Sequence, residues 1–357
     1  MWNLTTLILT FLLVLKTIDT SEHKMDSKAL SSAIAQFSAK FCVELEKGKS
    51  VVSSPLSAEF VLALLTLGTT EPAHTELLTA LGIPDDDSIR SSFTEVSSKL
   101  RSLKGVTFNV ANKVYLKDGS YDLQPSLKVD AEKVFNAGIE KIDFNTGAAA
   151  VEVINKWVES QTNEKIKDLL SSDSVDSDTR LVLINALYFK LLEMPYQGGE
   201  ASMLIVLPNE IEGLDGVLSK LASGFDLMSE IGKMHKTKVQ VTIPKFKIET
   251  EIDLADLLPK LGIKSIFDRA NSGLTKILNA DEPLFVSKAV QKAFIEVNEE
   301  GAEAAAATAM VTRRARSLVP VFAADRAALW LLRVAGHVVA LASYRAAALP
   351  PGPRDEL

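Results

Sequence analysis

The sequence predicts an α+β fold built around one large sheet. Helical patterns dominate the first half of the chain and strand patterns the second half, an order typical of α+β proteins. The run 181–189 is apolar nearly throughout, as expected for a strand buried on both faces. No fixed-period repeat or low-complexity linker divides the 357 residues. We therefore expect a single domain over residues 21–350.

The first half of the chain predicts mainly helices. Apolar residues recur at helical spacing from Ser27 to Lys47, and Gly48 ends the pattern. A short strand at Val51-Val52 precedes a helix cap in the sequence Ser53-Ser54-Pro55. Asp85-Asp86-Asp87 follows a proline and is interpreted as a solvated loop. Further helices are expected over 56–67, 75–81, 91–103 and 148–170, with a strand over 107–116.

The second half of the chain predicts mainly strands. Apolar alternation and short apolar runs mark them, with Pro208 and Pro244 as interruptions. Strands are expected over 181–189, 202–207, 238–248, 285–297, 329–334 and 338–341. Two helices are expected among them, over 213–221 and 254–261.

The two ends of the chain carry targeting signals. Residues 1–20 resemble a secretory signal peptide, because the apolar run from Leu4 to Leu15 is too short to span a membrane and polar residues follow it. The tail 351–357 ends in Arg354, Asp355, Glu356 and Leu357, one conservative step from the Lys-Asp-Glu-Leu retrieval signal. Together they predict a protein of the endoplasmic reticulum lumen or the secretory pathway, bound by a retrieval receptor.

Composition excludes several classes of function. A net charge of −7 argues against a nucleic-acid partner. The single cysteine, Cys42, excludes an internal disulfide and is expected to be a buried thiol. The four histidines are isolated, and no nucleophile elbow, phosphate loop or dinucleotide fingerprint is present. We expect no metal, no cofactor, no enzymatic activity and no membrane span.

The stretch from Glu296 to Ser317 stands out. An acidic turn with Gly301 leads into a run of alanines, and arginines then precede Ser317. Alanine has the highest helix propensity, so the run could form a helix. Alternatively, the small side chains could allow the segment to slip between two existing strands.

Several motifs decide between these interpretations. They occur in this order: Ser53-Ser54-Pro55-Leu56-Ser57, Ile154-Asn155-Lys156-Trp157-Val158, Leu183-Ile184-Asn185-Ala186-Leu187-Tyr188-Phe189-Lys190, Ile243-Pro244-Lys245-Phe246 and the stretch 297–307. With this order, most of the chain resembles the serpin family of serine protease inhibitors. The resemblance implies a serpin fold with N-terminal helices, a large central sheet and an exposed reactive loop over 301–320.

The resemblance also implies a mechanism. A serpin loop is cleaved by its target protease, and its N-terminal part then inserts as an extra strand into the main sheet. The hinge that must insert corresponds to Glu299, Glu300, Gly301, Ala302, Glu303, Ala304, Ala305, Ala306 and Ala307. The small residues of this hinge favour an inhibitory serpin over a non-inhibitory one. The shutter of the main sheet corresponds to Ser54, Ser57, Asn185 and Gln291.

The arginines indicate the target. Arg313, Arg314 and Arg316 suit a serine protease with an acidic primary pocket, either a trypsin-like enzyme or a furin-like proprotein convertase. Counting back from Phe322 places the reactive bond at Arg316-Ser317, whereas the commonest spacing from Gly301 gives Ala315. Cleavage after Arg314 stays open. We favour Arg316-Ser317, since cleavage after Ala315 would place an alanine instead of an arginine in the acidic primary pocket.

Three departures from the family pattern matter. Lys190 is followed directly by Leu191, where the family continues through several strands of its smaller sheets. Losing those strands would leave open sheet edges and expose core. Gln291 stands where many members have histidine, and the C-terminal hairpin has smaller residues, such as Ala328, than the family. The alternative is therefore a non-inhibitory or impaired isoform that acts as a binding or chaperone protein. We expect a monomer.

Overall fold

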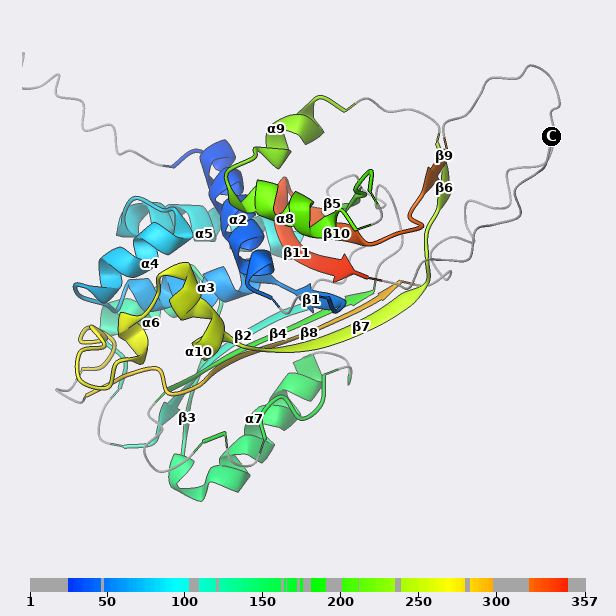
Figure 1. Ribbon diagram of the computed structural model, residues 1–357. Coiled ribbons are helices and arrows are strands. Elements are labelled where there is room, and N and C mark those ends of the chain that lie inside the picture. Colours follow the sequence, from blue (N-terminus) through cyan, green and yellow to red (C-terminus); the bar gives the residue numbers. More distant parts are fainter. Residues whose placement is uncertain are drawn as a thin grey trace, which may run out of the picture.

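A five-stranded sheet forms the centre of the fold (Figure 1). The computed structural model of the chain describes residues 25–45, 48–102, 109–119, 122–161, 164, 166–171, 174–175, 181–190, 201–210, 212–234, 239–279, 283–297 and 321–345. The strands of the sheet, in spatial order, are β3 (Gly138–Ile142), β2 (Asn109–Lys117), β4 (Leu181–Lys190), β8 (Ala289–Val297) and β7 (Phe246–Asp253). β2 runs parallel to β3, and β4 runs parallel to β8; the other pairs are antiparallel. The α+β prediction is confirmed.

A second sheet has four antiparallel strands, and a third has two parallel ones. In spatial order the second sheet contains β1 (Val51–Ser53), β11 (His337–Tyr344), β10 (Ala328–Val334) and β5 (Ala201–Val206). The third sheet pairs β6 (Gln240–Thr242) with β9 (Val321–Ala323). The main hydrophobic core joins the second sheet to the N-terminal helices and to the rear of the main sheet.

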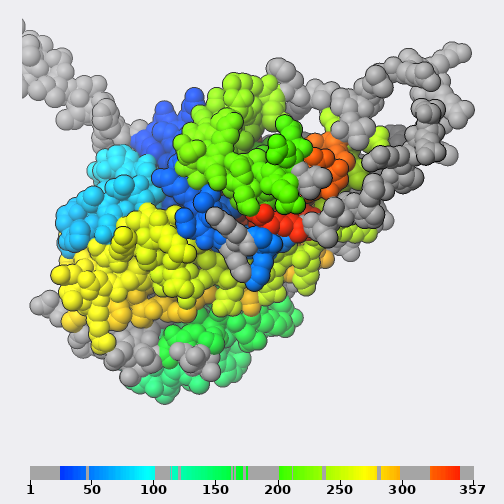
Figure 2. Space-filling model, in the orientation of Figure 1, coloured from blue at the N-terminus to red at the C-terminus, as the bar shows by residue number. Residues whose placement is uncertain are grey.

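Helices cover both faces of the main sheet. On one side lie α2 (Ser27–Val43), α3 (Pro55–Thr66), α4 (Ala73–Leu81), α5 (Asp86–Ser102), α6 (Pro125–Lys133) and α10 (Leu254–Leu257), and on the other lies α7 (Gly147–Gln161) (Figure 1). α8 (Leu214–Ala222) and α9 (Leu227–Gly232) lie beside the second sheet. In the space-filling view, the α7 segment forms the green part below the yellow and orange segments (Figure 2). Among the described helices, none is long and apolar enough to cross a bilayer.

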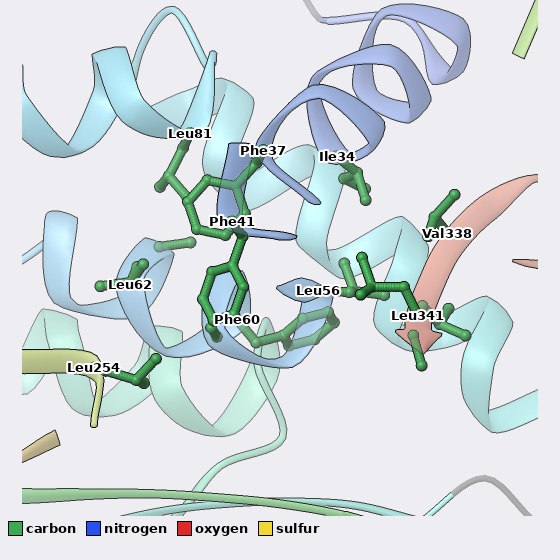
Figure 3. Packing of buried hydrophobic residues seen from close by; sticks show 14 of the residues in the cluster. Ile34, Phe37, Phe41, Leu56, Phe60, Leu62, Leu81, Leu254, Val338 and Leu341 are labelled. Atoms are coloured by element: carbon green, nitrogen blue, oxygen red, sulfur yellow. The ribbon is translucent and has the colours of Figure 1, made fainter. Parts of the chain in front are cut away.

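The helix-rich core is built on aromatic and branched side chains. Phe37, Phe41 and Phe60 lie together between α2 and α3 (Figure 3). Phe60 meets Phe93 of α5 edge to face, with the ring centroids 5.0 Å apart, a favoured aromatic geometry. α3 is buried along nearly its whole length, and the side chain of Ser54 caps its first turn. The apolar periodicity and the cap therefore place α2 and α3 as the sequence predicts.

Two of the three aspartates after Pro84 are helical. α5 begins at Asp86, five residues before the predicted start. The Asp85 carboxylate, just before the helix, accepts a hydrogen bond from the Ser88 backbone N–H (2.7 Å), and Asp86 and Asp87 occupy the first turn. Carboxylates at this end compensate the positive end of the helix dipole. The loop prediction was therefore wrong for Asp86 and Asp87, whereas Asp85 precedes the helix.

The helix predicted over 148–170 is too long. α7 ends at Gln161, and the chain then turns back along it through Glu164 and Asp168, both at positive φ (60° and 50°). The Asn155 side chain holds this return, because its amide donates to the Leu170 carbonyl and accepts from the Leu170 N–H, each at 2.8 Å. Ile166 and Leu169 were placed on the helix because they continue its apolar pattern, but both are buried in the returning segment instead.

The C-terminal hairpin retains a packed core despite its small residues. Trp330 is 1% exposed, and its ring lies 5.0 Å from that of Phe246. Tyr344, which stands opposite Ala328 in the register of β10 and β11, stacks on Phe246 with the ring centroids 4.4 Å apart. Ala328 is itself fully buried, so this small side chain is enclosed by its neighbours despite the replacement.

His337 is a buried histidine at the start of β11. Its Nδ1 lies 3.0 Å from the Ser31 hydroxyl, which donates its own proton to the Ser27 carbonyl, so Nδ1 must carry the hydrogen. Nε2 is buried and has no hydrogen-bond partner. Burial lowers the pKa of His337 from 6.5 to about 4, with nearby Lys99 and Arg333 contributing in the same direction and Glu95 opposing them. The imidazole is therefore neutral in the folded protein.

We expect His337 to make the fold acid-sensitive. The unfolded state takes up the proton near pH 6.5 and the folded state only near pH 4, so stability is present above 6.5 and falls as the pH drops between these values. The full loss is about 3 kcal/mol from this pKa difference. Thermal unfolding between pH 7 and 4 should show a shallower decline for His337→Gln than for the wild type. Parallel curves would contradict this role.

Candidate functional site

The parallel pair β4–β8 lies at the centre of the main sheet. Its register runs from Leu183 opposite Ala289 to Lys190 opposite Glu296. β8 leads directly into the alanine-rich stretch, and β4 ends at the Lys190-Leu191 junction. Because parallel strands end at the same edge, the expected hinge and the expected deletion both begin at this edge of the sheet. We call the line between β4 and β8 the seam.

Gln291 of β8 anchors the rear of the seam. Its side chain is 0% exposed. The carbonyl oxygen Oε1 accepts hydrogen bonds from the Ser53 hydroxyl (2.5 Å) and the Ser54 N–H (3.1 Å), while Nε2 donates to the Ser54 carbonyl (2.8 Å). The Ser54 hydroxyl then donates to the Val339 carbonyl of β11 (2.7 Å). This network connects the main sheet, the N-terminus of α3 and the second sheet.

Three of the predicted shutter residues, Ser54, Ser57 and Gln291, meet at this place. Ser54 and Gln291 are joined directly, and the Ser57 N–H donates to the Ser54 hydroxyl (3.3 Å). Asn185 of β4 stands opposite Gln291 in the register, and Asn112 of β2 stands opposite Asn185. One row of the sheet thus places three amide-bearing residues side by side across the seam.

Replacing Gln291 with glutamate should destabilise the protein in a pH-dependent way. A carboxylate cannot donate to the Ser54 carbonyl and would be a buried charge, a change that costs about 3 kcal/mol or more. Burial raises the pKa of such a carboxyl, so the loss grows as the pH rises above about 4.3 and shrinks in acid, where the protonated form can donate again. Chemical denaturation of Gln291→Glu at pH 5 and pH 8 measures this.

Gln240→Glu is the matched control, because Gln240 is exposed on β6. It should unfold like the wild type at both pH values. Equal effects of the two substitutions would contradict an anchoring role for the Gln291 amide.

α7 covers the front of the seam through a second hydrophobic cluster. Ile154 and Val158 of α7 belong to it with Tyr115 of β2 and with Val290 and Phe294 of β8. β2 and β8 lie on opposite sides of β4. An extra strand between β4 and β8 would widen this spacing by about 4.8 Å. The cluster therefore holds together strands that insertion would separate.

A charged and aromatic group attaches α7 to the edge of the sheet. The Lys113 ammonium lies 4.9 Å from the ring centroids of both Tyr115 and Trp157, and those two rings meet edge to face at 6.3 Å. The same ammonium bonds the Glu140 carboxylate of β3 at 2.5 Å. Cation–π contacts and an ion pair together fix Trp157 over β2. The sequence motif around Asn155 and Trp157 indicated this helix, but it did not predict that Lys113 contacts Trp157.

The other predicted site residues lie outside the described residues. They are the hinge (Glu299, Glu300, Gly301, Ala302, Glu303, Ala304, Ala305, Ala306, Ala307), the arginines Arg313, Arg314 and Arg316 with Ser317, and the tail Arg354, Asp355, Glu356 and Leu357. The signal peptide over 1–20 also lies outside them.

The described titratable groups do not form a metal centre. No three His, Cys, Asp and Glu side chains within the described ranges come together as a metal ion requires. Burial raises the pKa of the Cys42 thiol to about 12, so it is protonated and a poor nucleophile. Burial also raises the pKa of Glu59, a carboxyl on α3 that is 2% exposed.

Comparison with known proteins decides the family. The family model described as "Serpin (serine protease inhibitor)" matches residues 32–191 and 190–335, which together make up most of the chain. The chain belongs to the serpin family.

Its relatives include named protease inhibitors. This serpin is 37% identical to the antitrypsin of Bombyx mori, with 88% of this chain and 93% of the relative covered. It is 38% identical to antichymotrypsin-2 of the same insect, with 79% and 88% covered. Among solved structures it resembles Serpin48 of Tenebrio molitor, described as a highly specific serpin, with a TM-score of 0.74, 27% identity, and 89% and 98% covered.

The same comparisons support a deletion after Lys190. The two matches to the family model meet at residues 190–191. The alignment with the antitrypsin spans 367 positions, which exceeds the 357 residues of this chain although only 88% of them take part. The relative therefore contains residues that have no counterpart here.

Proposed function

We propose that this serpin is a suicide-substrate inhibitor of Arg-specific serine proteases, either furin-like proprotein convertases or trypsin-like enzymes. The observation that carries the proposal is the seam. β4 and β8 are parallel neighbours, and the chain that leaves β8 carries Gly301 and the small residues after it. A strand returning from that edge would enter the seam antiparallel to both neighbours.

The loop supplies the specificity in this proposal. Cleavage after Arg316 would place an arginine in an acidic primary pocket, with Arg313 and Arg314 available to further acidic subsites. The partner is accordingly a serine protease whose pocket is negatively charged. The small side chains of Ala302 and of Ala304 to Ala307 can pass between β4 and β8 without steric clash.

Arg316→Ala should abolish formation of an SDS-stable complex with trypsin or a furin-like convertase. The wild type should form that complex, since the acyl-enzyme survives only if the loop inserts before it is hydrolysed. Denaturing gels of the mixtures measure it. A complex that persists with Arg316→Ala would move the reactive bond to Arg314 or Ala315. A cleaved loop with fully active protease in the wild-type mixture would contradict the proposal.

A second candidate is a non-inhibitory binding or chaperone protein, and the deletion after Lys190 favours it. The thermal stability of the loop-cleaved protein separates the two functions. Insertion of a sixth strand into the main sheet should raise the melting temperature well above that of the intact protein. An unchanged melting temperature after complete cleavage would favour the binding protein.

We further propose that the protein acts in the lumen of the endoplasmic reticulum, retrieved through Arg354, Asp355, Glu356 and Leu357. Deleting these four residues should move the protein from the cell lysate to the medium of expressing cells, because the retrieval receptor would no longer bind it. Immunoblots of both fractions measure the shift. An unchanged distribution would contradict retrieval. A second variant, in which two glycines follow Leu357, blocks the same signal without deleting it and should shift to the medium in the same way.

A further inference from the structure

The expected reactive loop leads at its C-terminal end into β9, which fastens it to the body of the protein. β9 pairs with β6 over three residues, and Thr242 stands opposite Ala323 at the end of the pair. The chain continues into Ala324, whose N–H donates to the Thr242 carbonyl at 2.9 Å and whose side chain is buried. We call β9 and the following residues, as far as Ala327, the C-terminal anchor of the loop.

Arg326 attaches this C-terminal anchor to a second part of the protein. Its Nη1 donates to the Asn209 carbonyl at 2.6 Å, in the segment between β5 and α8. Its Nε and Nη2 donate to the two oxygens of the Asp325 carboxylate, at 2.8 and 3.3 Å. An arginine fork on a carboxylate is a strong and directional contact. Asp325 thus holds the guanidinium in the orientation in which it reaches Asn209.

β6 by itself is a weak holding point for β9. All three residues of β6 are exposed, so this strand buries no side chain in the core. In the C-terminal anchor, Phe322 and Ala327 are only partly buried where they pack against the main core. The Arg326 guanidinium adds to these apolar contacts a charge-assisted hydrogen bond to a different element. Arg326 therefore contributes a large share of what holds β9 in place.

The C-terminal anchor lies at the edge of the main sheet where β8 ends. Three residues separate β6 from β7, which starts at Phe246 opposite Val297, the last residue of β8. Figure 1 shows β6 and β9 beyond this edge. A loop segment that enters the seam antiparallel to β8 runs away from the edge. An uncut loop that inserts therefore draws its C-terminal end in the same direction and pulls on β9, whereas cleavage removes the pull.

We propose that Arg326 is a positioning residue that keeps the loop from inserting before it is cleaved. The inference rests on the proposed inhibitory function, since it concerns when the new strand enters the seam. Arg326 acts through its bond to Asn209. Once this bond is lost, β9 is held by the exposed β6 and by apolar contacts, and it can leave with the loop. The protein then reaches the inserted state without a protease and loses its bait.

Incubation of the full chain without protease tests this role. Samples taken over time are mixed with trypsin, and denaturing gels give the fraction that still forms an SDS-stable complex. Arg326→Gln should lose this fraction about tenfold faster than the wild type, because losing the charge-assisted bonds lowers the barrier to release of β9. Arg326→Lys, which keeps the charge without the fork, should lie between them. Arg269→Gln, at an exposed arginine over the Phe285 ring, is the matched control and should match the wild type.

The melting temperature of the incubated, uncut protein separates this role from a merely structural one. An inserted loop adds a strand to the main sheet, so incubated Arg326→Gln should remain an uncut chain and melt above the freshly prepared variant. Loss of complex formation at the wild-type rate, or an incubated form that melts no higher, would overturn the proposal. Failure of the inhibitory function gives a different result, because trypsin would then cleave fresh wild type without a complex and without a rise in melting temperature.

Discussion

The pairing of β4 with β8 is the contact on which the rest of this molecule depends. Parallel ladders are slightly less stable per residue than antiparallel ones, and these two strands are joined by a long stretch of chain rather than by a hairpin. Two separate attachments support the pair. Gln291 fixes β8 to the second sheet from behind, and the hydrophobic cluster under α7 joins β2 to β8 in front. A sheet that must accept a strand needs a seam that is stable when closed and still separable.

At each attachment a side-chain amide pairs with a backbone. Gln291 bonds the N–H and C=O of Ser54, and Asn155 bonds those of Leu170. A side-chain amide offers a donor and an acceptor side by side, so it pairs with a backbone as a neighbouring strand does. Such pairs satisfy buried polar groups in full, which is the condition for burying them at low cost. Because a side-chain amide does not titrate, the pairing of Gln291 with Ser54 is independent of pH.

The deletion after Lys190 affects one part of the molecule more than the rest. The described core remains packed, and the aromatic stack of Trp330, Phe246 and Tyr344 fills the space beside the shortened side chains of the C-terminal hairpin. Among the described residues, the second sheet ends at β5, a strand without charged residues that begins shortly after the junction. The main sheet retains its five strands and both attachments. The pairing of β4 with β8 thus remains in place.

Local signals in the sequence determined much of this fold. The periodicity of α2, the cap before α3 and the apolar run of β4 are each encoded within a few residues, so they could be predicted directly. The order of the serpin motifs indicated Ser54, Ser57, Asn185 and Gln291 as one group, and the structure brings Ser54, Ser57 and Gln291 into one hydrogen-bonded network. The sequence analysis missed the strands β3 and β9, the helices α6 and α9, and two 3-10 turns at Phe144–Thr146 and Ser265–Phe267, because these short or polar segments carry weak periodicity.

Tertiary structure decided what periodicity could not. The apolar Ile166 and Leu169 predicted a longer helix, yet the Asn155 amide holds that segment as a non-helical stretch that returns along α7. Asp86 and Asp87 became helical because a helix terminus stabilises their charge. Lys113 reaches Trp157 across 44 positions of sequence, and Gln291 reaches Ser54 across 237. Such contacts form because the folded chain brings together segments that lie far apart in the sequence. A local sequence pattern carries no information about these pairings.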